Sequence, residues 1–318
     1  MRDSAHRLGE FCVGAITVVG VLWVADLPLH LGIPLIAEHV VLVIAGLAVA
    51  AGFLLRPYGK IAGGLEILLA LFAMGCWAWA AFNYTDWLLN AADRTPGKWL
   101  PGVLGLALLL EAVRRNCGTA IAVLIGVIGL YGFVGHWLPG VLEAAYTEPR
   151  RMVIYLYADP NGVPGLVLRV ASSIVLAFIV FSKTLEIGGA GKFFDDLSMG
   201  LLGRYRGGPA KVAVVSSSLF GIVSGSSVAN VVSSGIVTIP LMKRHGFKGT
   251  YAAAVEAVAS NAGQFTPPVM GTAAFLIAEF LEIPYSDVVL AAIIPAAIFY
   301  VVLLVQIDCH AAREGLHG

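Results

Sequence analysis

The stretch VAVVSSSLFGIVSGSSVANVVSSGIVTIPLM, residues 212–242, decides how this chain is arranged. Lys211 precedes it, and Lys243 and Arg244 follow it, so both of its ends are basic. Basic residues that flank apolar segments stay in the cytoplasm, and a single crossing would leave one of these ends outside. The stretch is also short for two full crossings, each of which needs about 20 residues. The pattern therefore predicts a re-entrant hairpin of two half-helices.

The predicted tip of this hairpin is the sequence Ser224-Gly225-Ser226-Ser227. Glycine permits backbone angles that other residues avoid, and Ser226 or Ser227 can cap the second half-helix. Non-helical backbone at membrane depth has to be buried in protein or face a water-filled site. One long tilted helix with a serine-rich packing face is the alternative that the residues leave open.

A second interruption is expected in the apolar run 249–282, which is too long for an ordinary span. It contains the sequence Gly263-Gln-Phe-Thr-Pro-Pro268, whose tandem proline removes two backbone donors and disfavours helix at Thr266. Transporters use the unwound carbonyls of such broken helices to hold cations and anionic substrates. The two breaks can meet near the middle of the membrane, where serine hydroxyls and freed carbonyls supply the neutral oxygens that Na⁺ requires.

Several polar side chains accompany these breaks. Glu256 lies one turn before Ser260 in the first half of the broken span, and intramembrane carboxylates are often functional. A surface position, with the Glu256 side chain reaching Arg244 or Lys248, is the alternative. The remaining polar candidates, which can contact a carboxylate substrate or bond between helices, are Asn230, Asn261 and Gln264.

Composition places the whole chain in a membrane. Of its 318 residues 58% are hydrophobic and 13% are charged, about half the charged fraction of an ordinary soluble domain. Lys and Arg together number 20, as do Asp and Glu, so the net charge indicates no nucleic-acid partner. The 4 cysteines form no C-x-x-C pair, and neither a disulfide nor a zinc site is expected.

Further apolar stretches are long enough to cross the bilayer as helices. They lie near 11–31, 36–55, 61–82, 119–138, 163–183 and 288–306, with a shorter one at 99–113. The first is expected to be an uncleaved span. We predict an all-α integral membrane protein with about eight transmembrane crossings, the re-entrant hairpin 212–242 and the broken helix 249–282.

Loop charges predict the topology. Basic residues place the N-terminus, the loops 56–60 and 114–118 and the segment 183–211 in the cytoplasm. The loops 83–99 and 139–162 then lie outside, and both termini are cytoplasmic. The segment 185–211 mixes Phe and Leu with Lys and Arg, which predicts an amphipathic helix at the membrane surface.

At residues 207–280, GGPAKVAVVSSSLFGIVSGSSVANVVSSGIVTIPLMKRHGFKGTYAAAVEAVASNAGQFTPPVMGTAAFLIAEF, the chain resembles the permease of tripartite ATP-independent periplasmic (TRAP) transporters. The resemblance is to the fused branch that works with TAXI-type binding proteins, and GFVGHWLPG at 132–140 also resembles that branch. It implies small-subunit-like helices in 1–115, connecting helices in 116–184 and the first half of the large-subunit transport domain in 185–318.

The resemblance further implies a Na⁺-driven elevator importer of organic acids in the bacterial inner membrane, fed by an extracytoplasmic TAXI-type binding protein. Its substrate and ion site corresponds to Ser224, Gly225, Ser226, Ser227, Asn230, Asn261, Gly263, Gln264, Thr266, Pro267 and Pro268. Within this set, Na⁺ is expected at Ser224, Ser226, Ser227, Gly263 and Thr266. Family permeases carry a second, inverted copy of the hairpin and broken helix. We therefore expect the remaining half of the permease as a partner, and no transport by residues 1–318 alone.

Two other functions are weighed against a transporter. An intramembrane hydrolase could use Ser224, but Gly221-Ile-Val-Ser224-Gly225 is not a nucleophile elbow, so no enzymatic activity is expected. A channel, or a membrane scaffold without transport activity of its own, is the stronger alternative. No cofactor is expected besides Na⁺ as the coupling ion.

Overall fold

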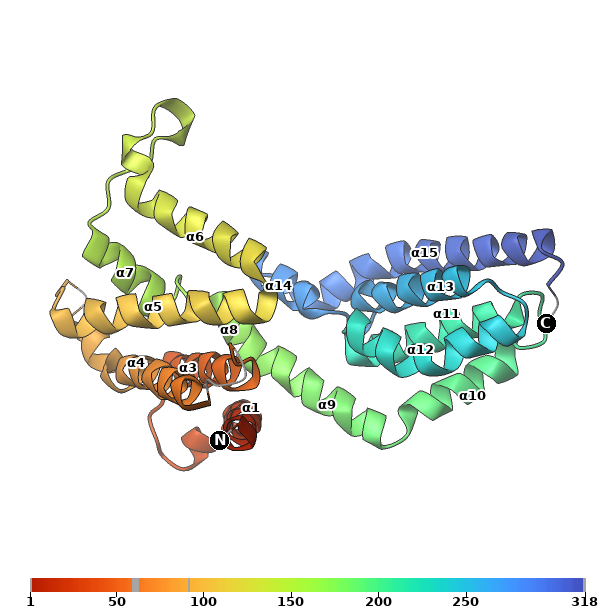
Figure 1. The fold of residues 1–318 in the computed structure, drawn as a ribbon, viewed down its shortest axis with the longest axis horizontal. Helices are drawn as coiled ribbons and strands as arrows, with labels where there is room; N and C mark the ends of the chain where they lie inside the picture. Colours follow the sequence, from red (N-terminus) through yellow and green to blue (C-terminus); the bar gives the residue numbers. More distant parts are fainter. Residues whose placement is uncertain (1, 59–62, 91, 317–318) are drawn as a thin grey trace. The chain divides into compact units, whose positions relative to one another are not determined.

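The computed structural model describes residues 2–58, 63–90 and 92–316, and this part of the chain is helical without any β-strand. The prediction of an all-α protein is thereby confirmed. Two compact units share the chain, Met1–Leu176 and Ala177–Gly318 (Figure 1). Lys60 and the start of the predicted span 61–82 lie outside the described residues. The functional division at residues 115 and 184 stays a prediction.

The first unit is organised around one central helix. Its elements are α1 (Arg2–Val24), α2 (Leu27–His30), α3 (Ala37–Leu55), α4 (Gly63–Leu89), α5 (Pro96–Cys117), α6 (Thr119–Val134), the 3₁₀ turns Gly135–Trp137 and Gly140–Leu142, α7 (Pro149–Ala158), α8 (Leu166–Val170) and the π-helical turn Ala171–Val175. Helix α3 packs against both α1 and α4, and its Leu42 and Phe53 are fully buried. A buried ion pair joins α4 to α5, in which Arg115 Nη1 lies 2.5 Å from Glu66 Oε2.

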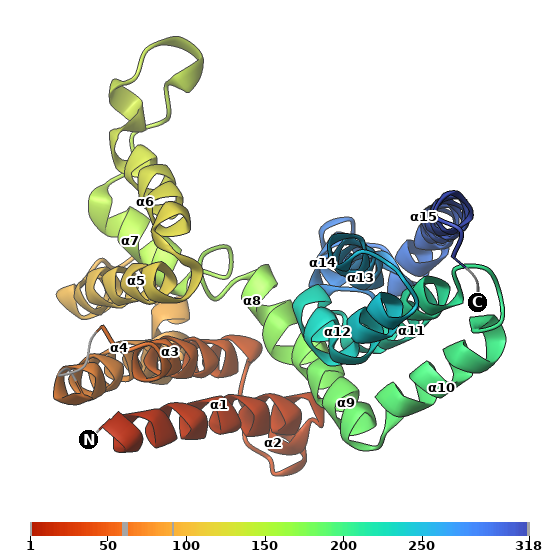
Figure 2. The ribbon, with the colours of Figure 1, turned by 45° about the vertical axis from the view of Figure 1, so that its right-hand side comes forward.

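The second unit holds both predicted interruptions. It contains most of α9 (Leu176–Ile187), then α10 (Ala190–Leu202), α11 (Gly208–Ser224), α12 (Ser227–Arg244), α13 (Gly249–Ala262), the 3₁₀ turn η4 (Gly263–Phe265), α14 (Thr272–Phe280) and α15 (Tyr285–Arg313). Helices α11, α12 and α13 lie side by side (Figure 2) and pack pairwise against one another. The small buried residues Ala210, Ala213 and Ala259 let their backbones approach closely.

The hairpin is present. Helix α11 ends at Ser224, helix α12 begins at Ser227, and Gly225 between them has a left-handed φ of 60°. The arms are antiparallel, because the hydroxyl oxygens of Ser217 and Ser234 lie 3.1 Å apart. The single long helix considered as an alternative is therefore wrong. Whether the hairpin re-enters the membrane from one side stays a prediction.

The broken helix is also present. Helix α13 ends at Ala262, a 3₁₀ turn follows, and helix resumes only at Thr272. In the described part of the chain, seven helices are long and apolar enough to cross a membrane. Together with the α13–α14 pair, they agree with the prediction of about eight crossings.

Two boundaries differ from the predictions. The first span was expected at 11–31, but α1 ends at Val24, because Asp26 adopts a left-handed φ of 52° and a separate short helix, Leu27–His30, follows it. The predicted loop 139–162 contains helix α7. Its Tyr157 is fully buried and packs on Trp77, with ring centroids 4.9 Å apart, so tertiary packing accounts for this helix.

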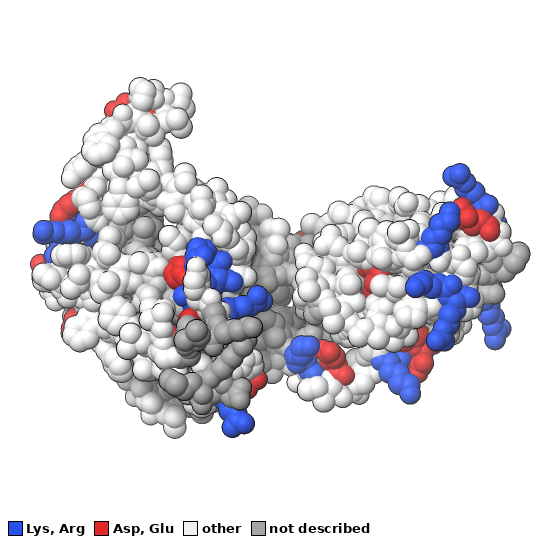
Figure 3. Space-filling view, in the orientation of Figure 1, with Lys and Arg blue, Asp and Glu red and all other residues white. Residues whose placement is uncertain are grey.

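Many Lys and Arg side chains of the second unit lie at the end where α12 and α15 end and α11 begins (Figure 3). At this end, Lys211 Nζ lies 2.5 Å from Asp308 Oδ1 of α15. The two flanks of the hairpin thus share one end of the unit, and each arm is about 26 Å long at 1.5 Å per residue. A membrane around this unit would place both flanks on the same side.

We expect cysteines introduced at Tyr205 and Lys243, both exposed, to react with an impermeant maleimide from the cytoplasmic side only. A cysteine at the exposed Glu282, just after the C-terminal end of α14, is the matched control and should react from the other side of the membrane. The background lacks the natural cysteines Cys12, Cys76, Cys117 and Cys309. Labelling of Tyr205→Cys and Lys243→Cys from opposite sides would contradict the hairpin topology.

Candidate functional site

Two glycines bring the hairpin and the broken helix into direct backbone contact. A Cβ atom added to Gly221 of α11 would lie 2.6 Å from Gly263 Cα, and one added to Gly263 would lie 2.5 Å from Gly221 Cα. Real Cβ atoms do not approach other atoms this closely, so only glycine fits on either side. Contact between the first arm of the hairpin and the start of the break therefore depends on the absence of side chains.

The hairpin tip is enclosed by the loop that follows the break. Gln264 Nε2 donates to Ser227 Oγ at 2.9 Å, which ties the break to the second arm. The Gly271 amide donates to Gln264 O at 2.6 Å and closes the loop. A Cβ atom on Gly225 would lie 2.6 Å from Met270 O, so the loop backbone also contacts the tip.

The structure brings some of the predicted Na⁺ ligands together but not all of them. Ser224, Ser226 and Ser227 are together at the tip, where the Ser226 amide donates to Ser224 Oγ at 3.4 Å. Thr266 lies elsewhere: its buried hydroxyl donates to Ala262 O at 2.7 Å and pairs with the Tyr300 hydroxyl of α15 at 2.8 Å. The tip serines and Gln264 are thus brought together, whereas the hydroxyl of Thr266 faces α15.

The remaining predicted residues fall into different environments. Asn230 is fully buried and donates from Nδ2 to Ser217 O at 2.7 Å across the hairpin. Asn261 is exposed and forms no side-chain hydrogen bond within the described part of the chain. The carbonyl of Pro268, beside Pro267, accepts from the Tyr285 hydroxyl at 2.9 Å.

Glu256 is the centre of a buried polar network. Its carboxylate is fully enclosed, and Oε1 accepts hydrogen bonds from three serine hydroxyls, Ser217 at 2.7 Å, Ser234 at 2.5 Å and Ser260 at 3.1 Å. Oε2 accepts from Thr238 Oγ1 at 2.5 Å. These donors come from α11, α12 and α13, so one carboxylate joins all three helices.

No basic side chain pairs with Glu256 among the described residues. The alternative in which Glu256 reaches Arg244 or Lys248 at the membrane surface is therefore wrong. A buried carboxylate without a cationic partner is costly unless hydrogen bonds compensate it, and here four hydroxyl groups do so. Ser260, one turn after Glu256 in α13, is one of these four donors.

The sequence reasoning missed the residues that support the tip. Gly221, Ser217 and Ser234 were not among the predicted site residues, and serines of this stretch were considered only as the packing face of the alternative single helix. A signal was present, because Asn230, Ser234 and Thr238 recur every four residues and so share one face of α12. The contribution of Tyr300, which is 34 residues from Thr266, could come only from the fold.

Comparison with known proteins supplies the family. The model of the DctM component of tripartite ATP-independent periplasmic transporters matches residues 104–318, more than half of the chain. The chain belongs to this TRAP transporter family. The match includes the hairpin, the broken helix and the Glu256 network.

Curated relatives share the same region of this DctM-family chain. An uncharacterised protein of Sinorhizobium fredii is 35% identical over 38% of the chain and 29% of its own length. The C4-dicarboxylate TRAP transporter large permease protein of Vibrio cholerae is 28% identical over 44% of the chain and 30% of its own length. An ectoine/5-hydroxyectoine TRAP transporter large permease protein of Ruegeria pomeroyi is 28% identical over 46% of the chain and 34% of its own length. The matched segment spans about a third of these relatives, and no solved structure matches.

We expect Gly221→Ala and Gly263→Ala each to destabilise the purified protein by about 1–3 kcal/mol, because the added methyl group overpacks a backbone contact. The measurement is thermal unfolding in detergent. Gly200→Ala in α10 is the matched control, since a Cβ atom there meets nothing within 4 Å. Unfolding temperatures of the Gly221 and Gly263 variants at or above that of the control would contradict the close approach.

We expect Glu256→Leu to lower the free energy of unfolding by about 1–3 kcal/mol, because its hydroxyl donors lose their common acceptor. Glu256→Gln should cost less, since the amide oxygen still accepts. Glu279→Gln, at an exposed position of α14, is the control and should leave stability unchanged. Full stability of the leucine variant would show that the network does not hold the helices together.

Proposed function

We propose that this chain is the membrane permease component of a Na⁺-coupled, binding-protein-dependent secondary transporter that imports organic acids by an elevator-type movement. One observation carries the proposal, the packing of a hairpin tip against a helix break through Gly221 and Gly263, in a chain of the DctM family. Paired breaks of this kind are how secondary transporters present backbone dipoles to ions and anionic substrates.

Na⁺ is proposed to bind through neutral oxygens at the tip. Within the described residues no group of three or more His, Cys, Asp or Glu side chains could hold a metal ion, so a cation here depends on hydroxyl and carbonyl groups. Ser224, Ser226 and Ser227 supply hydroxyls at the tip, and Gly263 and Thr266 contribute carbonyls freed by the break. Oxygen ligands of this kind suit a hard cation.

The substrate is proposed to be a small carboxylate. The matched relatives are named for C4-dicarboxylates and for ectoines, which favours small polar solutes. Gln264, which donates to Ser227 at the tip, and the exposed Asn261 both carry amide donors. Asn230 is buried and already bonded to Ser217 O, so its role in this proposal is to shape the tip rather than to contact the solute.

The Glu256 network supports the elevator movement. An elevator requires the ion and substrate site to move as a rigid block, and the carboxylate ties α11, α12 and α13 together directly below the tip. Partly satisfied networks loosen a core, whereas fully satisfied ones make it rigid. In this proposal Glu256 and Ser260 act by rigidity and do not themselves bind Na⁺.

The proposed partners follow from the family. They are an extracytoplasmic binding protein of the TAXI type, the remaining half of the permease and a lipid bilayer, which in a bacterium would be the inner membrane. Residues 1–115 are proposed to act as the fused small subunit. We propose that the chain acts as a permease rather than as an enzyme, in keeping with its membership of a transporter family.

Uptake in sealed proteoliposomes tests the proposal. The chain is reconstituted together with the second half of a DctM-family permease, and a radiolabelled C4-dicarboxylate is supplied with a TAXI-type binding protein. We expect saturable, concentrative uptake that needs both the binding protein and an inward Na⁺ gradient. Concentrative uptake by residues 1–318 alone would contradict the expectation that transport needs a second, inverted copy of the hairpin and broken helix. Non-saturable flux without a gradient would indicate a channel.

In that system we expect Ser227→Ala to raise the Na⁺ concentration for half-maximal uptake by about tenfold, because it removes one tip hydroxyl and the partner of Gln264. Ser286→Ala at the start of α15, far from the tip in sequence and exposed, is the matched control. Unchanged Na⁺ dependence in both Ser226→Ala and Ser227→Ala would count against a cation site at this tip.

A further inference from the structure

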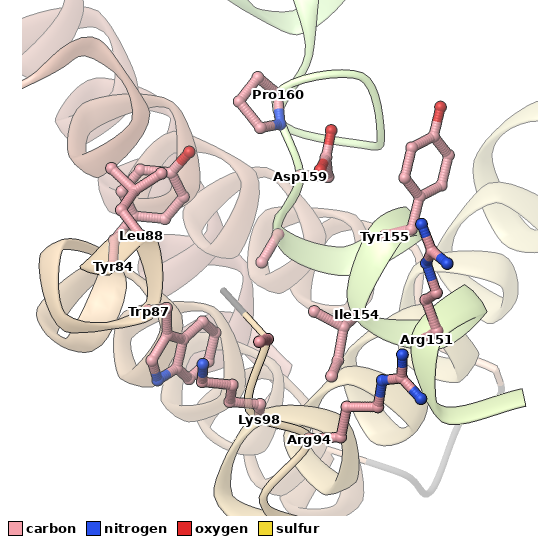
Figure 4. A pocket seen from close by; sticks show the side chains of 12 residues that line it. Tyr84, Trp87, Leu88, Arg94, Lys98, Arg151, Ile154, Tyr155, Asp159 and Pro160 are labelled. Carbon is pink, nitrogen blue, oxygen red and sulfur yellow. The ribbon is translucent and has the colours of Figure 1, made fainter. Parts of the chain in front are cut away.

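The first unit contains a pocket of about 560 Å³ that shares no residue with the proposed transport site. Its walls come from the C-terminal end of α4, the segment that leads into α5, and helix α7 (Figure 4). The residues that matter for its chemistry are Tyr84, Trp87, Arg94, Lys98, Arg151 and Asp159. The transport proposal uses none of them.

Positive charge dominates this pocket. Three cationic side chains, Arg94, Lys98 and Arg151, line it against one carboxylate, Asp159. Asp159 Oδ1 is already engaged, because Asn161 donates to it from the backbone at 2.9 Å and from Nδ2 at 3.0 Å. Arg94 pairs with Glu148, whereas Lys98 and Arg151 have no carboxylate partner in the part of the chain that the structure describes.

Two buried polar groups in the wall are incompletely bonded. Lys98 is 6% exposed, and its ammonium, which carries three donors, makes one hydrogen bond, to Asn90 O at 2.5 Å. Tyr84 is 2% exposed, and its hydroxyl has no hydrogen-bond partner among the described residues. Buried polar groups are rarely left in this state, and the spare donors of the Lys98 ammonium in the pocket wall point to a ligand that accepts hydrogen bonds.

We propose that this pocket binds the phosphate group of a membrane phospholipid. A phosphate offers several acceptor oxygens and negative charge, which match the guanidinium of Arg151 and the ammonium of Lys98. In Figure 4, Arg94 and Arg151 line one side of the pocket and Lys98 lies beside Trp87 on the other. A headgroup between them would meet cations from two directions.

The position of the pocket favours a lipid over a free phosphate ion. It lies where two candidate membrane spans meet their loop, at the end of Gly64–Leu89 and the start of Pro96–Cys117. Trp87 and Tyr155 are of the residue types that concentrate at headgroup level. Beside them, Leu88 is 50% exposed in the lining and Leu89 is 79% exposed next to it, which provides an apolar surface for acyl chains.

The test is a binding titration of the purified, detergent-solubilised 318-residue chain with dioleoyl phosphatidylglycerol, followed by native mass spectrometry. We expect Arg151→Gln and Lys98→Met each to raise the dissociation constant of the most tightly bound lipid by about tenfold, since each removes a charge-assisted hydrogen bond. Arg151 is exposed, so its variant keeps the core intact even if Lys98→Met folds poorly.

Arg150→Gln is the matched control. Arg150 is the neighbouring exposed arginine of the same helix, but it stacks on Trp99, with Cζ 5.7 Å from the ring centroid, and does not line the pocket. We expect this variant to bind the lipid like the parent chain. Equal lipid affinity in Arg151→Gln and Arg150→Gln would overturn the site.

A second titration, with inorganic phosphate, distinguishes the two sources of the anion. We expect millimolar phosphate to leave the bound phosphatidylglycerol in place. Displacement of the lipid by inorganic phosphate, together with weaker phosphate binding in Arg151→Gln, would show a site for a free anion and overturn the lipid assignment.

Discussion

Backbone that leaves a helix inside a membrane must find partners for its N–H and C=O groups, and the second unit of this protein is arranged around that requirement. Each group left unsatisfied in hydrocarbon costs several kcal/mol. The hairpin tip and the helix break each satisfy backbone groups locally, through the Gly225 amide on Gly221 O and the Gly271 amide on Gln264 O, and a side-chain bond from Gln264 to Ser227 joins them. Gln264 supplies both a side-chain donor to Ser227 and a carbonyl acceptor for the Gly271 amide. The two segments can approach this closely only because residues 221 and 263 are glycines.

The buried carboxylate of Glu256 likewise has to find its hydrogen-bond partners inside the protein. Glu256 has no cationic partner in the described part of the chain, yet every hydroxyl donor around it belongs to a neighbouring turn or helix. A network of this kind rigidifies only when it is complete. The hairpin and the first half of the broken helix are therefore held as one block, which is the property that the proposed elevator needs.

The first unit differs from the second in how its charged side chains are paired. Its deeply buried ion pair joins Arg115 to Glu66, whereas Lys98 and Arg151 of the pocket beside α7 have no carboxylate partner in the described part of the chain. An unpaired cation near the surface of a membrane protein is stable where an anion is always at hand, and a bilayer supplies phosphate at that depth. The two units thus combine a polar site formed by backbone breaks with a proposed lipid contact formed by side chains.

The sequence by itself determined the class of the protein, the hairpin and the break. Apolar length, the basic flanks of 212–242 and the glycine and tandem proline at the two interruptions are local signals, and local backbone chemistry decides where a helix stops. Only the tertiary structure decided the partners. Helix α7 forms because Tyr157 is buried against Trp77. The Thr266 hydroxyl pairs with the Tyr300 hydroxyl and not with the tip serines. The Glu256 side chain is buried inside the helix bundle and does not reach the surface. These outcomes depend on contacts between residues far apart in the chain, and local spacing shows at most which residues share a face of one helix, not which partner that face meets.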